Sequence, residues 1–408
     1  MNNNTTYKDS PLGKIPKDWE VRTLGEVCLL KGEYGINAPA VEYKDELPTY
    51  IRITDIDDDG NYSTIKKASV DDINSQNFLL KEGDIIFART GATVGKTYLY
   101  DVKDGDLVFA GFLIRFRPNN SKLKSQYLNY YTSTKSYWDW VKKVSMRSGQ
   151  PGINAEEYSS LKLPLPPLPE QARIAEVLGT WDKAITNLQA TITQKELRNK
   201  WLMQQLLTGK KRLKGFGGEW KKVKAEEIFK NISIKGNENE ELLSATQDRG
   251  IIPRSMLEGR VTMPSGELNS FKLVDKGNFV ISLRSFQGGL EYSYFRGLVS
   301  PAYTVLKPKK SIYDEFYKYY FKSYDFIGHL AIAVIGIRDG KQISYDDFCS
   351  VKIPYPTIEE QTAIANVLQT ASNEVQLLQQ QLDKLREQKK GLMQVLLTGK
   401  KRLYIKNI

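Results

Sequence analysis

The sequence predicts an α+β protein built from two similar globular domains and two long helices. The main observation is a repeat: Glu170 to Leu213 and Glu360 to Leu403 align without a gap, are identical at 21 of 44 positions, and both end in LLTGKKRL. Two copies at this distance indicate duplication of one large module rather than a solenoid array. The segments before each copy mix short β-type runs with helical segments, which is typical of the α+β class.

Composition fits a protein of two or three soluble domains, with 408 residues of which 40% are hydrophobic. No apolar stretch approaches the roughly 20 residues of a membrane span, and the first residues lack a signal-peptide core, so we expect a cytoplasmic protein with no membrane contact. Cys28, Cys349 and the single histidine, His329, argue against a zinc site or a histidine-based triad. The net charge of +11 favours contact with a polyanion such as nucleic acid.

Each copy of the repeat predicts one long helix preceded by a proline-rich hinge. Proline disfavours helical geometry in the residue before it, so each helix should begin just after its prolines. Acidic residues near each predicted start suit the helix dipole, and glycine followed by Lys and Arg suits each predicted end. The hinge prolines are Pro164, Pro166, Pro167 and Pro169 in the first copy, and Pro354 and Pro356 in the second.

Apolar residues in both helices recur at alternating steps of three and four, the pattern of a coiled coil. In the first helix they are Ile174, Leu178, Trp181, Ile185, Leu188, Ile192, Leu202 and Leu206; in the second they are Ile364, Leu368, Ala371, Val375, Leu378, Leu382, Leu385, Leu392 and Leu396. Lys195, Asn199 and Lys389 interrupt these seams, and we hypothesise that they fix the pairing register. The alternative is that each helix packs on its own globular domain.

The order of the segments predicts an antiparallel coiled coil. If the two ends of the second globular domain lie close together, the second helix starts where the first one stops and must run back along it. The helices would then form a rod of about 60 Å with pseudo-twofold symmetry and one domain at each end. The predicted domains are 1–163 and 214–353, and the predicted hinge-and-helix segments are 164–213 and 354–408.

The two globular domains are predicted to share a fold while differing in surface. GDIIFAR from Gly83 matches GNFVISLR from Gly277, and MRSGQ from Met146 resembles IRDGK from Ile337. The helices are far more alike than the domains. This contrast indicates that the helices meet one kind of partner twice while the domains meet different targets; relaxed drift of ordinary domains is the alternative.

Three motifs carry a resemblance to a known family. A proline-rich lead into Glu-Gln and an amphipathic helix occurs twice, as PLPPLPEQARIAEVL from Pro164 and PYPTIEEQTAIANVL from Pro354. Both helices end in LLTGKKRL, and GDIIFARTGATVGK begins at Gly83. On these motifs nearly the whole chain resembles the specificity (S) subunit of type I restriction-modification systems, the HsdS family.

The resemblance implies that the chain recognises DNA and has no catalytic activity of its own. Each domain would be a target-recognition domain reading one half of a bipartite, asymmetric site in double-stranded DNA. Two methyltransferase (M) subunits, which use S-adenosylmethionine, would dock on the helices, and restriction (R) subunits would add ATP- and Mg-dependent translocation and cleavage. The second copy departs from the first at Thr357 and Ile358, where Pro167 and Leu168 stand, which affects only the expected hinge geometry.

The residues also argue independently against catalysis. The sequence has no Asn or Asp followed by Pro-Pro and an aromatic residue, the motif that holds a flipped adenine, because leucines flank Pro166 and Pro167. GATVGKT from Gly91 looks like a phosphate loop, but three residues separate its glycines where four are needed. We therefore expect no cofactor on this chain and interpret this segment as a turn.

Candidate DNA-binding residues come from polar loops that recur in both domains and from the basic run after the first helix, because Lys and Arg contact phosphates while Arg, Gln, Ser and Thr contact base edges. They are Arg89, Thr90, Thr93, Lys96, Arg147, Ser148 and Gln150 in the first domain, Lys210, Lys211 and Arg212 in the basic run, and Arg284, Ser285, Gln287, Arg338 and Lys341 in the second domain. Aromatic clusters around Tyr127 and Tyr317 have helical spacing, which favours a place in the core over base stacking.

A second class of function fits the same organisation. A coiled-coil adaptor whose two globular domains bind protein, with no role on DNA, would also have a duplicated helix and divergent domains. The family resemblance favours DNA recognition, and each domain would then correspond to one half-site.

Overall fold

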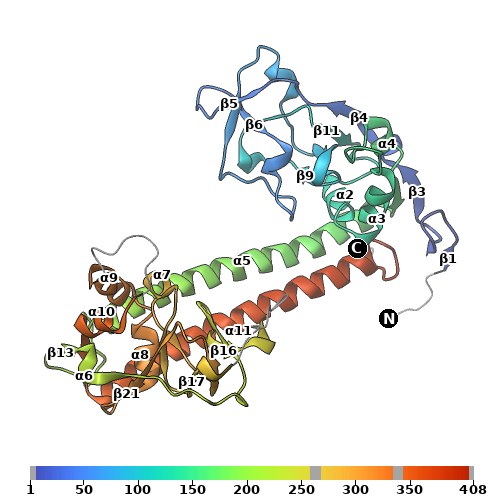
Figure 1. Ribbon diagram of the computed structural model, residues 1–408. Helices are drawn as coiled ribbons and strands as arrows, with labels where there is room; N and C mark the ends of the chain where they lie inside the picture. The colour runs from blue at the N-terminus through green and yellow to red at the C-terminus, as the bar shows by residue number, and fades with distance from the viewer. Residues whose placement is uncertain (1–5, 258–267, 334–342, 404–408) are drawn as a thin grey trace. The chain divides into compact units, whose positions relative to one another are not determined.

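The computed structural model describes residues 6–257, 268–333 and 343–403. The chain divides into two compact units (Figure 1), of which unit 1 comprises residues 1–187 and 381–408 and unit 2 comprises residues 188–380. The two long helices, α5 (Leu168–Leu206) and α11 (Ile358–Leu396), each contribute to both units. Each unit therefore contains one globular part and a portion of both helices.

Unit 1 is built on a four-stranded antiparallel sheet in the order β4-β11-β8-β9, joined by a second four-stranded sheet in the order β10-β6-β7-β5. Its strands are β1 (Tyr7–Lys8), β2 (Ile15–Pro16), β3 (Glu20–Thr23), β4 (Cys28–Tyr34), β5 (Ala40–Glu42), β6 (Thr49–Ile51), β7 (Ala68–Val70), β8 (Ile85–Ala88), β9 (Thr97–Leu99), β10 (Leu107–Phe109), β11 (Leu113–Pro118) and β12 (Lys162–Leu165). Its shorter helices are α1 (Leu24–Val27), α2 (Ser125–Tyr131), α3 (Lys135–Val144) and α4 (Ala155–Ser159), with 3-10 turns at Ile53–Asp55, Ser75–Phe78, Gly91–Thr93 and Val102–Asp104.

Unit 2 repeats the main sheet in the order β14-β21-β18-β19, and two-stranded pairs take the place of the second sheet. Its strands are β13 (Lys221–Lys224), β14 (Phe229–Ile232), β15 (Leu243–Thr246), β16 (Gly250–Pro253), β17 (Lys272–Val274), β18 (Phe279–Ile281), β19 (Glu291–Tyr292), β20 (Gly297–Val299), β21 (Thr304–Pro308) and β22 (Lys352–Tyr355). Its shorter helices are α6 (Ala225–Ile228), α7 (Ser285–Gly288), α8 (Asp314–Tyr320), α9 (Tyr324–Ala333) and α10 (Tyr345–Ser350), with 3-10 turns at Arg254–Met256 and Leu268–Ser270.

The sheets of the two units correspond residue by residue at their centres. In unit 1, Phe116 on β11 pairs with Ile85 on β8, and in unit 2 Leu306 on β21 pairs with Phe279 on β18. The preceding turns match as well, because Gly83 and Gly277 have φ of 88–89°, which glycine adopts without steric cost. The predicted α+β class and the expected likeness of the two domains agree with this arrangement.

Both long helices end where their sequences predict, and α11 begins after its hinge prolines as predicted, whereas α5 begins at Leu168, before the last proline of its hinge. Each is 39 residues long. Pro169 lies in the first turn of α5, where proline is tolerated because the first amides of a helix have no partner within the helix. Each ends three residues before a glycine, Gly209 or Gly399, that has a φ of 71°. The left-handed glycine ends the helix and lets the following basic residues turn back toward the globular part.

The first turns of each helix belong to the core of a globular part. In unit 1, Ile174 and Leu178 lie in one apolar cluster with Trp19 and Tyr127. In unit 2, Ile364, Ala365 and Leu368 lie in the corresponding cluster. The first turns of each helix therefore pack on the helix's own domain, which was the alternative interpretation of the seam. Further along, residues of the same helix contact the other long helix.

Within each unit, α5 and α11 contact one another and run in opposite directions. In unit 2, Nδ2 of Asn199 donates to the carbonyl of Ala371 at 2.8 Å, while the earlier residue Lys195 pairs with the later residue Glu374. In unit 1, Lys389 of α11 pairs with Asp182 of α5 at 2.5 Å. The polar residues that interrupt the two seams thus contact the neighbouring helix.

The Glu-Gln motif at the start of each helix is buried and fixes the hinge. The side chain of Gln171 accepts from the amide of Lys124 at 2.9 Å and donates to the carbonyl of Pro166 at 2.8 Å. In unit 2, Gln361 accepts from the amide of Tyr313 and donates to the carbonyl of Pro356, both at 2.8 Å. A glutamine can make both bonds at once because its amide is donor and acceptor together, which explains why this residue type occurs in both copies.

The glutamate of each motif joins the final arginine of the repeated LLTGKKRL run to a tryptophan. In unit 1, Glu170 accepts from Trp19 Nε1 at 3.0 Å and from Arg402 Nε and Nη2 at 2.6 Å. In unit 2, Glu360 accepts from Trp220 Nε1 at 2.9 Å and from Arg212 Nη2 at 2.6 Å. We call each set a Trp–Glu–Arg cluster. Charge-assisted bonds to a buried carboxylate contribute about 1.5–3 kcal/mol each, so these clusters stabilise the junction of helix and globular part.

Within the described ranges, no helix combines the length and apolar character that a membrane span requires.

Candidate nucleic-acid interface

Two of the predicted polar loops of unit 1 lie against each other. Thr90 and Gly152 form an antiparallel bridge, and the amide of Gly91 donates to the carbonyl of Pro151 at 3.0 Å. The segment from Gly91 is a 3-10 turn between β8 and β9, as predicted, rather than a phosphate loop. The structure therefore brings Arg89, Thr90 and Thr93 to the same edge of the unit as the 147–152 loop, although the two segments are far apart in sequence.

Arg89 is the most distinctive side chain at this edge. Its guanidinium carbon lies over the rings of Tyr34, at 5.0 Å, and Phe112, at 5.8 Å. Its Nε is buried and has no hydrogen-bond partner, and the guanidinium forms no ion pair with a described residue. Sequence reasoning missed Tyr34 and Phe112, because both are single aromatic residues elsewhere in the chain and nothing in their spacing links them to Arg89.

Gln150 and Ser148 are exposed, and Gln150 lies against the turn that follows this arginine. Gly91 has a φ of 71°, and a Cβ at that position would lie 2.9 Å from Nε2 of Gln150. The close approach of Gln150 to the glycine backbone keeps the amide next to the 89–93 turn. Exposed amide and hydroxyl groups of this kind can donate to and accept from base edges.

Two predicted cations of unit 1 are neutralised within the protein. Lys96 pairs with Asp58 at 2.7 Å and donates to the carbonyl of Ile56 at 3.4 Å. Arg147 pairs with Glu157 and donates to the carbonyl of Val144 at 3.0 Å. Their structural partners compete with any phosphate, so they are weaker candidates for DNA contact than Arg89.

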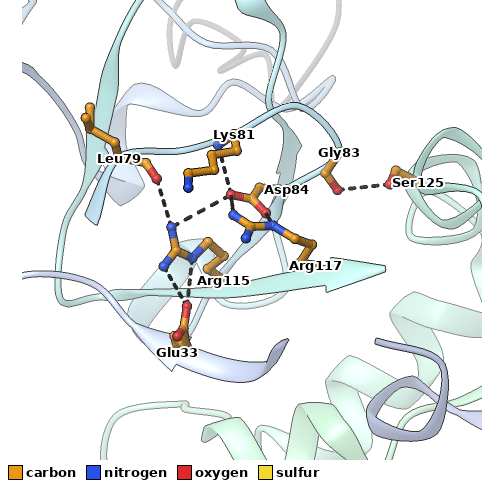
Figure 2. Close-up of polar contacts among 8 residues, drawn as sticks. All are labelled: Glu33, Leu79, Lys81, Gly83, Asp84, Arg115, Arg117 and Ser125. Carbon is orange, nitrogen blue, oxygen red and sulfur yellow. Dashed lines mark hydrogen bonds and ion pairs between the residues drawn. The ribbon is translucent and has the colours of Figure 1, made fainter. Parts of the chain in front are cut away.

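A second group of arginines in unit 1 is wholly structural. Figure 2 shows Asp84, which is fully buried, accepting from Arg117 Nε at 2.6 Å, from Arg117 Nη2 at 2.7 Å and from the amide of Lys81 at 2.9 Å. Arg115 donates to Glu33 at 2.6 Å and to the carbonyl of Leu79 at 2.8 Å. Hydrogen bonds from Arg117 to Asp84 raise the pKa of Arg117, although its burial opposes the shift. These paired charges hold the sheet together rather than face a ligand.

In unit 2, the corresponding segment divides into structural and exposed residues. Ser285 is buried, and its Oγ accepts from the amide of Ser282 at 2.8 Å, so it caps a turn. Arg284 and Gln287 are exposed on either side of it. Arg338 and Lys341, the remaining candidates of this domain, lie outside the described residues.

Arg284 borders a cavity of about 610 Å³. Gln247, Asp248 and Glu291 also line it. Burial raises the pKa of Glu291, although the ammonium of Lys322, 2.8 Å from Oε1, opposes the shift. The cavity thus has an exposed cation, Arg284, that can donate hydrogen bonds to a ligand and acidic groups that can accept them.

The basic run after α5 contains three differently placed cations. Lys210 is exposed, and Lys211 is exposed with its ammonium 4.7 Å from the centre of the Trp201 ring. Arg212 belongs to the Trp–Glu–Arg cluster of unit 2 and also donates to the carbonyl of Gly217 at 3.1 Å. Contact with phosphate therefore suits the two lysines better than the arginine.

The central tyrosines of the aromatic clusters are core, as their helical spacing favoured, whereas Trp138 is exposed. Tyr127, Tyr137 and Tyr317 are fully buried, and the hydroxyls of Tyr127 and Tyr317 each donate to a hinge carbonyl, of Pro164 and Pro354, at 2.8 Å. Among the described residues, no three His, Cys, Asp or Glu side chains gather into a possible metal site.

Comparison with known proteins identifies the family of this chain. Residues 16–197 and 217–387 each match the type I restriction modification DNA specificity domain. The chain is 27% identical to the putative type I restriction enzyme MjaX specificity subunit of Methanocaldococcus jannaschii, with 97% of each chain covered. It is 25% identical to the MjaVIII specificity subunit of the same organism, over 97% of this chain and 95% of that one.

Solved structures show the same fold. The HsdS subunit from Thermoanaerobacter tengcongensis superposes with a TM-score of 0.53 at 19% identity, over 96% of this chain and 100% of that one. The S subunit from M. genitalium superposes with a TM-score of 0.55 at 15% identity, over 97% of each chain. With a specificity domain matched in both halves, the chain belongs to the specificity-subunit (HsdS) family of type I restriction-modification systems.

Proposed function

We propose that this chain is the DNA-recognition subunit of a type I restriction-modification complex, with each globular part reading one half of a bipartite, asymmetric site. The observation that carries the proposal is the double match to the DNA specificity domain, one match covering the globular part of each unit. The two parts share a main four-stranded sheet but differ in the strands beside it, as expected if each reads a different sequence.

The long helices would form an antiparallel coiled coil with pseudo-twofold symmetry that sets the distance between half-sites. Opposed contacts between α5 and α11 occur within each unit, and the buried positions Ile192 and Leu382 follow the predicted seam. A helix pair is stiff enough to hold two reading domains at a fixed separation. Its length would then correspond to the unread bases between the half-sites.

The catalytic steps would belong to partner subunits. Two methyltransferase subunits would dock on the helices and supply S-adenosylmethionine chemistry, while restriction subunits would use ATP and Mg²⁺. This chain would bind none of these cofactors itself, and its contribution would be selection and positioning of the DNA.

A domain exchange tests the proposal. Residues 1–163 are replaced by the equivalent part of another specificity subunit, and methylated adenines are mapped by long-read sequencing in cells that carry the partner subunits. One half of the methylated sequence should change while the other half and the spacing stay the same. A change in both halves would contradict modular reading, and methylation patterns that are independent of this chain would remove its role on DNA.

A further inference from the structure

Arg89 has the geometry of a base-reading residue rather than a structural one. The other arginines of the sheet, Arg115 and Arg117, are satisfied by carboxylates and a carbonyl. Arg89 has aromatic neighbours in place of acidic ones, since Tyr34 and Phe112 lie beneath its guanidinium. Rings attract the cation without using its N–H donors, so the two terminal Nη groups are left for a ligand, while Nε is buried.

The backbone around Arg89 is fixed. Its amide donates to the carbonyl of Phe112 at 3.0 Å, and its carbonyl accepts from the amide of Ile153 at 2.9 Å. The hydroxyl of Tyr34 accepts from the amide of Ala155 at 3.1 Å, which holds that ring in place. A long side chain ordered in advance loses less conformational entropy on binding, which favours both affinity and selectivity.

The surroundings are suited to a base edge. Phe112 is 54% exposed, so the arginine lies at an open edge of the unit. Thr90, Thr93 and Gln150 add neutral donors and acceptors beside it. A planar guanidinium presents two parallel N–H groups, and the base edge that accepts two such bonds is that of guanine, through O6 and N7 in the major groove.

We propose that Arg89 is a specificity-determining residue that reads a guanine in the half-site bound by the globular part of unit 1. This inference rests on the proposed DNA-reading function. Unit 2 has Leu283, an exposed apolar residue, at the corresponding place six residues after the turn glycine, in line with Arg89 after Gly83. The guanine contact made from this position is therefore expected in one half-site only, whatever the neighbouring Arg284 contacts in the other.

The test compares Arg89→Ala, Arg89→Lys and the matched control Leu283→Ala in the complete system. Methylated sites are mapped by long-read sequencing, and methylation rates are measured on oligonucleotides with each base substituted in turn. Arg89→Ala should make one guanine position of one half-site degenerate and lower the rate on the original site by about 10- to 100-fold, the usual discrimination of a bidentate pair. Arg89→Lys keeps the charge but lacks the two parallel N–H groups, so it should weaken the preference for guanine at the same position. Leu283→Ala should leave that half-site unchanged.

Different outcomes separate the inference from the function on which it rests. An even loss at every position of the half-site would overturn the inference, because it indicates a phosphate contact or a structural role. An unchanged sequence preference would overturn it too. Thermal unfolding of the Arg89→Ala chain shows whether an even loss comes from instability. If the unaltered chain directs no sequence-specific methylation, the proposed function itself fails, whatever Arg89 does.

Discussion

The two units have the same contacts where the long helix joins the globular part, but different residues at the centre of their main sheets. Glu170 and Glu360 make matching bonds to an arginine and a tryptophan. At the turn before the central strand, unit 1 has the buried ion network of Asp84, whereas unit 2 has Asn278, whose Oδ1 accepts from the amide of Asp275 at 3.0 Å. The two units are thus alike where the globular part joins the long helices and differ inside the globular part itself.

The difference at the turn follows from the partner strand. Arg115 and Arg117 on β11 occupy the positions of Val305 and Lys307 on β21, as the strand registers show. A buried arginine needs a carboxylate beside it, whereas a buried valine and an exposed lysine do not. One fold therefore accepts either a charged set, Asp84 with two arginines, or an uncharged residue, Asn278, with valine and lysine. Within each set, changing one residue alone leaves another without its partner.

The largest expected effect comes from breaking this set in unit 1. Asp84→Asn gives unit 1 the residue of unit 2 but leaves Arg117 without its carboxylate. Removing one partner of a buried pair costs about 3–5 kcal/mol of stability. Chemical denaturation of the purified chain should show this loss, located in unit 1 by hydrogen exchange.

A compensated variant sharpens the same comparison. Asp84→Asn combined with Arg115→Val and Arg117→Lys gives these three positions the residues of unit 2 and leaves the half-exposed Glu33 without Arg115. It should recover much of the stability that the single variant loses. If the triple variant is less stable than the single one, the network is not a self-contained alternative and the comparison between the units fails.

The next largest effect distinguishes the two Trp–Glu–Arg clusters. Arg402 also donates to both carboxylate oxygens of Asp18 at 2.8 Å, which lowers the pKa of Asp18, whereas Arg212 has backbone carbonyls as its other partners. Among the described residues, Glu360→Gln leaves Arg212 with no carboxylate, while Glu170→Gln leaves Arg402 with that of Asp18. We expect Glu360→Gln to cost about 2–3 kcal/mol and Glu170→Gln about 1 kcal/mol less, measured as local hydrogen-exchange stability in each unit. Equal losses would show that Asp18 contributes nothing.

How far sequence could go differs between these regions. The helices, their starts and their ends follow from local signals: a period of three and four, hinge prolines, and Gly209 and Gly399 at the ends. The likeness of the sheets was visible in the Gly83 and Gly277 runs. These features depend on residues close together in the chain, so the spacing of residue types is enough to predict them.

Pairings between residues far apart in the chain could not be predicted from the sequence. Arg212 looked like part of a basic run because its neighbours are lysines, yet its partner Glu360 lies in the other copy of the repeat. Lys96 pairs with Asp58, and Arg89 rests on Tyr34, through folding that no local pattern encodes. The loops that carry candidate DNA-binding residues could be located from sequence, but which cations are already neutralised required the fold.

A smaller effect is expected from the exposed lysines of the repeated TGKKRL run. Lys210 and Lys211 in unit 2 have Lys400 and Lys401 as counterparts in unit 1. Replacing either pair with alanine should weaken binding of the assembled complex to all DNA sequences alike and reduce the salt slope by about 0.9 for each phosphate that the lysines no longer neutralise. Arg212 and Arg402 are kept, because their removal would disturb the fold. A slope that stays the same for both pairs would exclude this run from the interface, and a change for only one pair would assign the phosphate binding to that unit.

The smallest effect concerns the half-exposed ion pairs between the helices. Hydrogen bonds from Lys195 and then Arg198 lower the pKa of Glu374. Because the folded pKa lies below the unfolded value, the stabilisation is present at neutral pH and is lost as the pH falls through the folded pKa. Glu374→Gln should therefore lower the thermal midpoint slightly at neutral pH and not at all once the pH is below the folded pKa, with high salt reducing the difference. Asn199→Ala, which removes an uncharged hydrogen bond to the carbonyl of Ala371, should have an effect independent of pH and salt. If Glu374→Gln instead behaves like Asn199→Ala, the pairing of the helices in unit 2 depends on hydrogen bonding and packing rather than on charge.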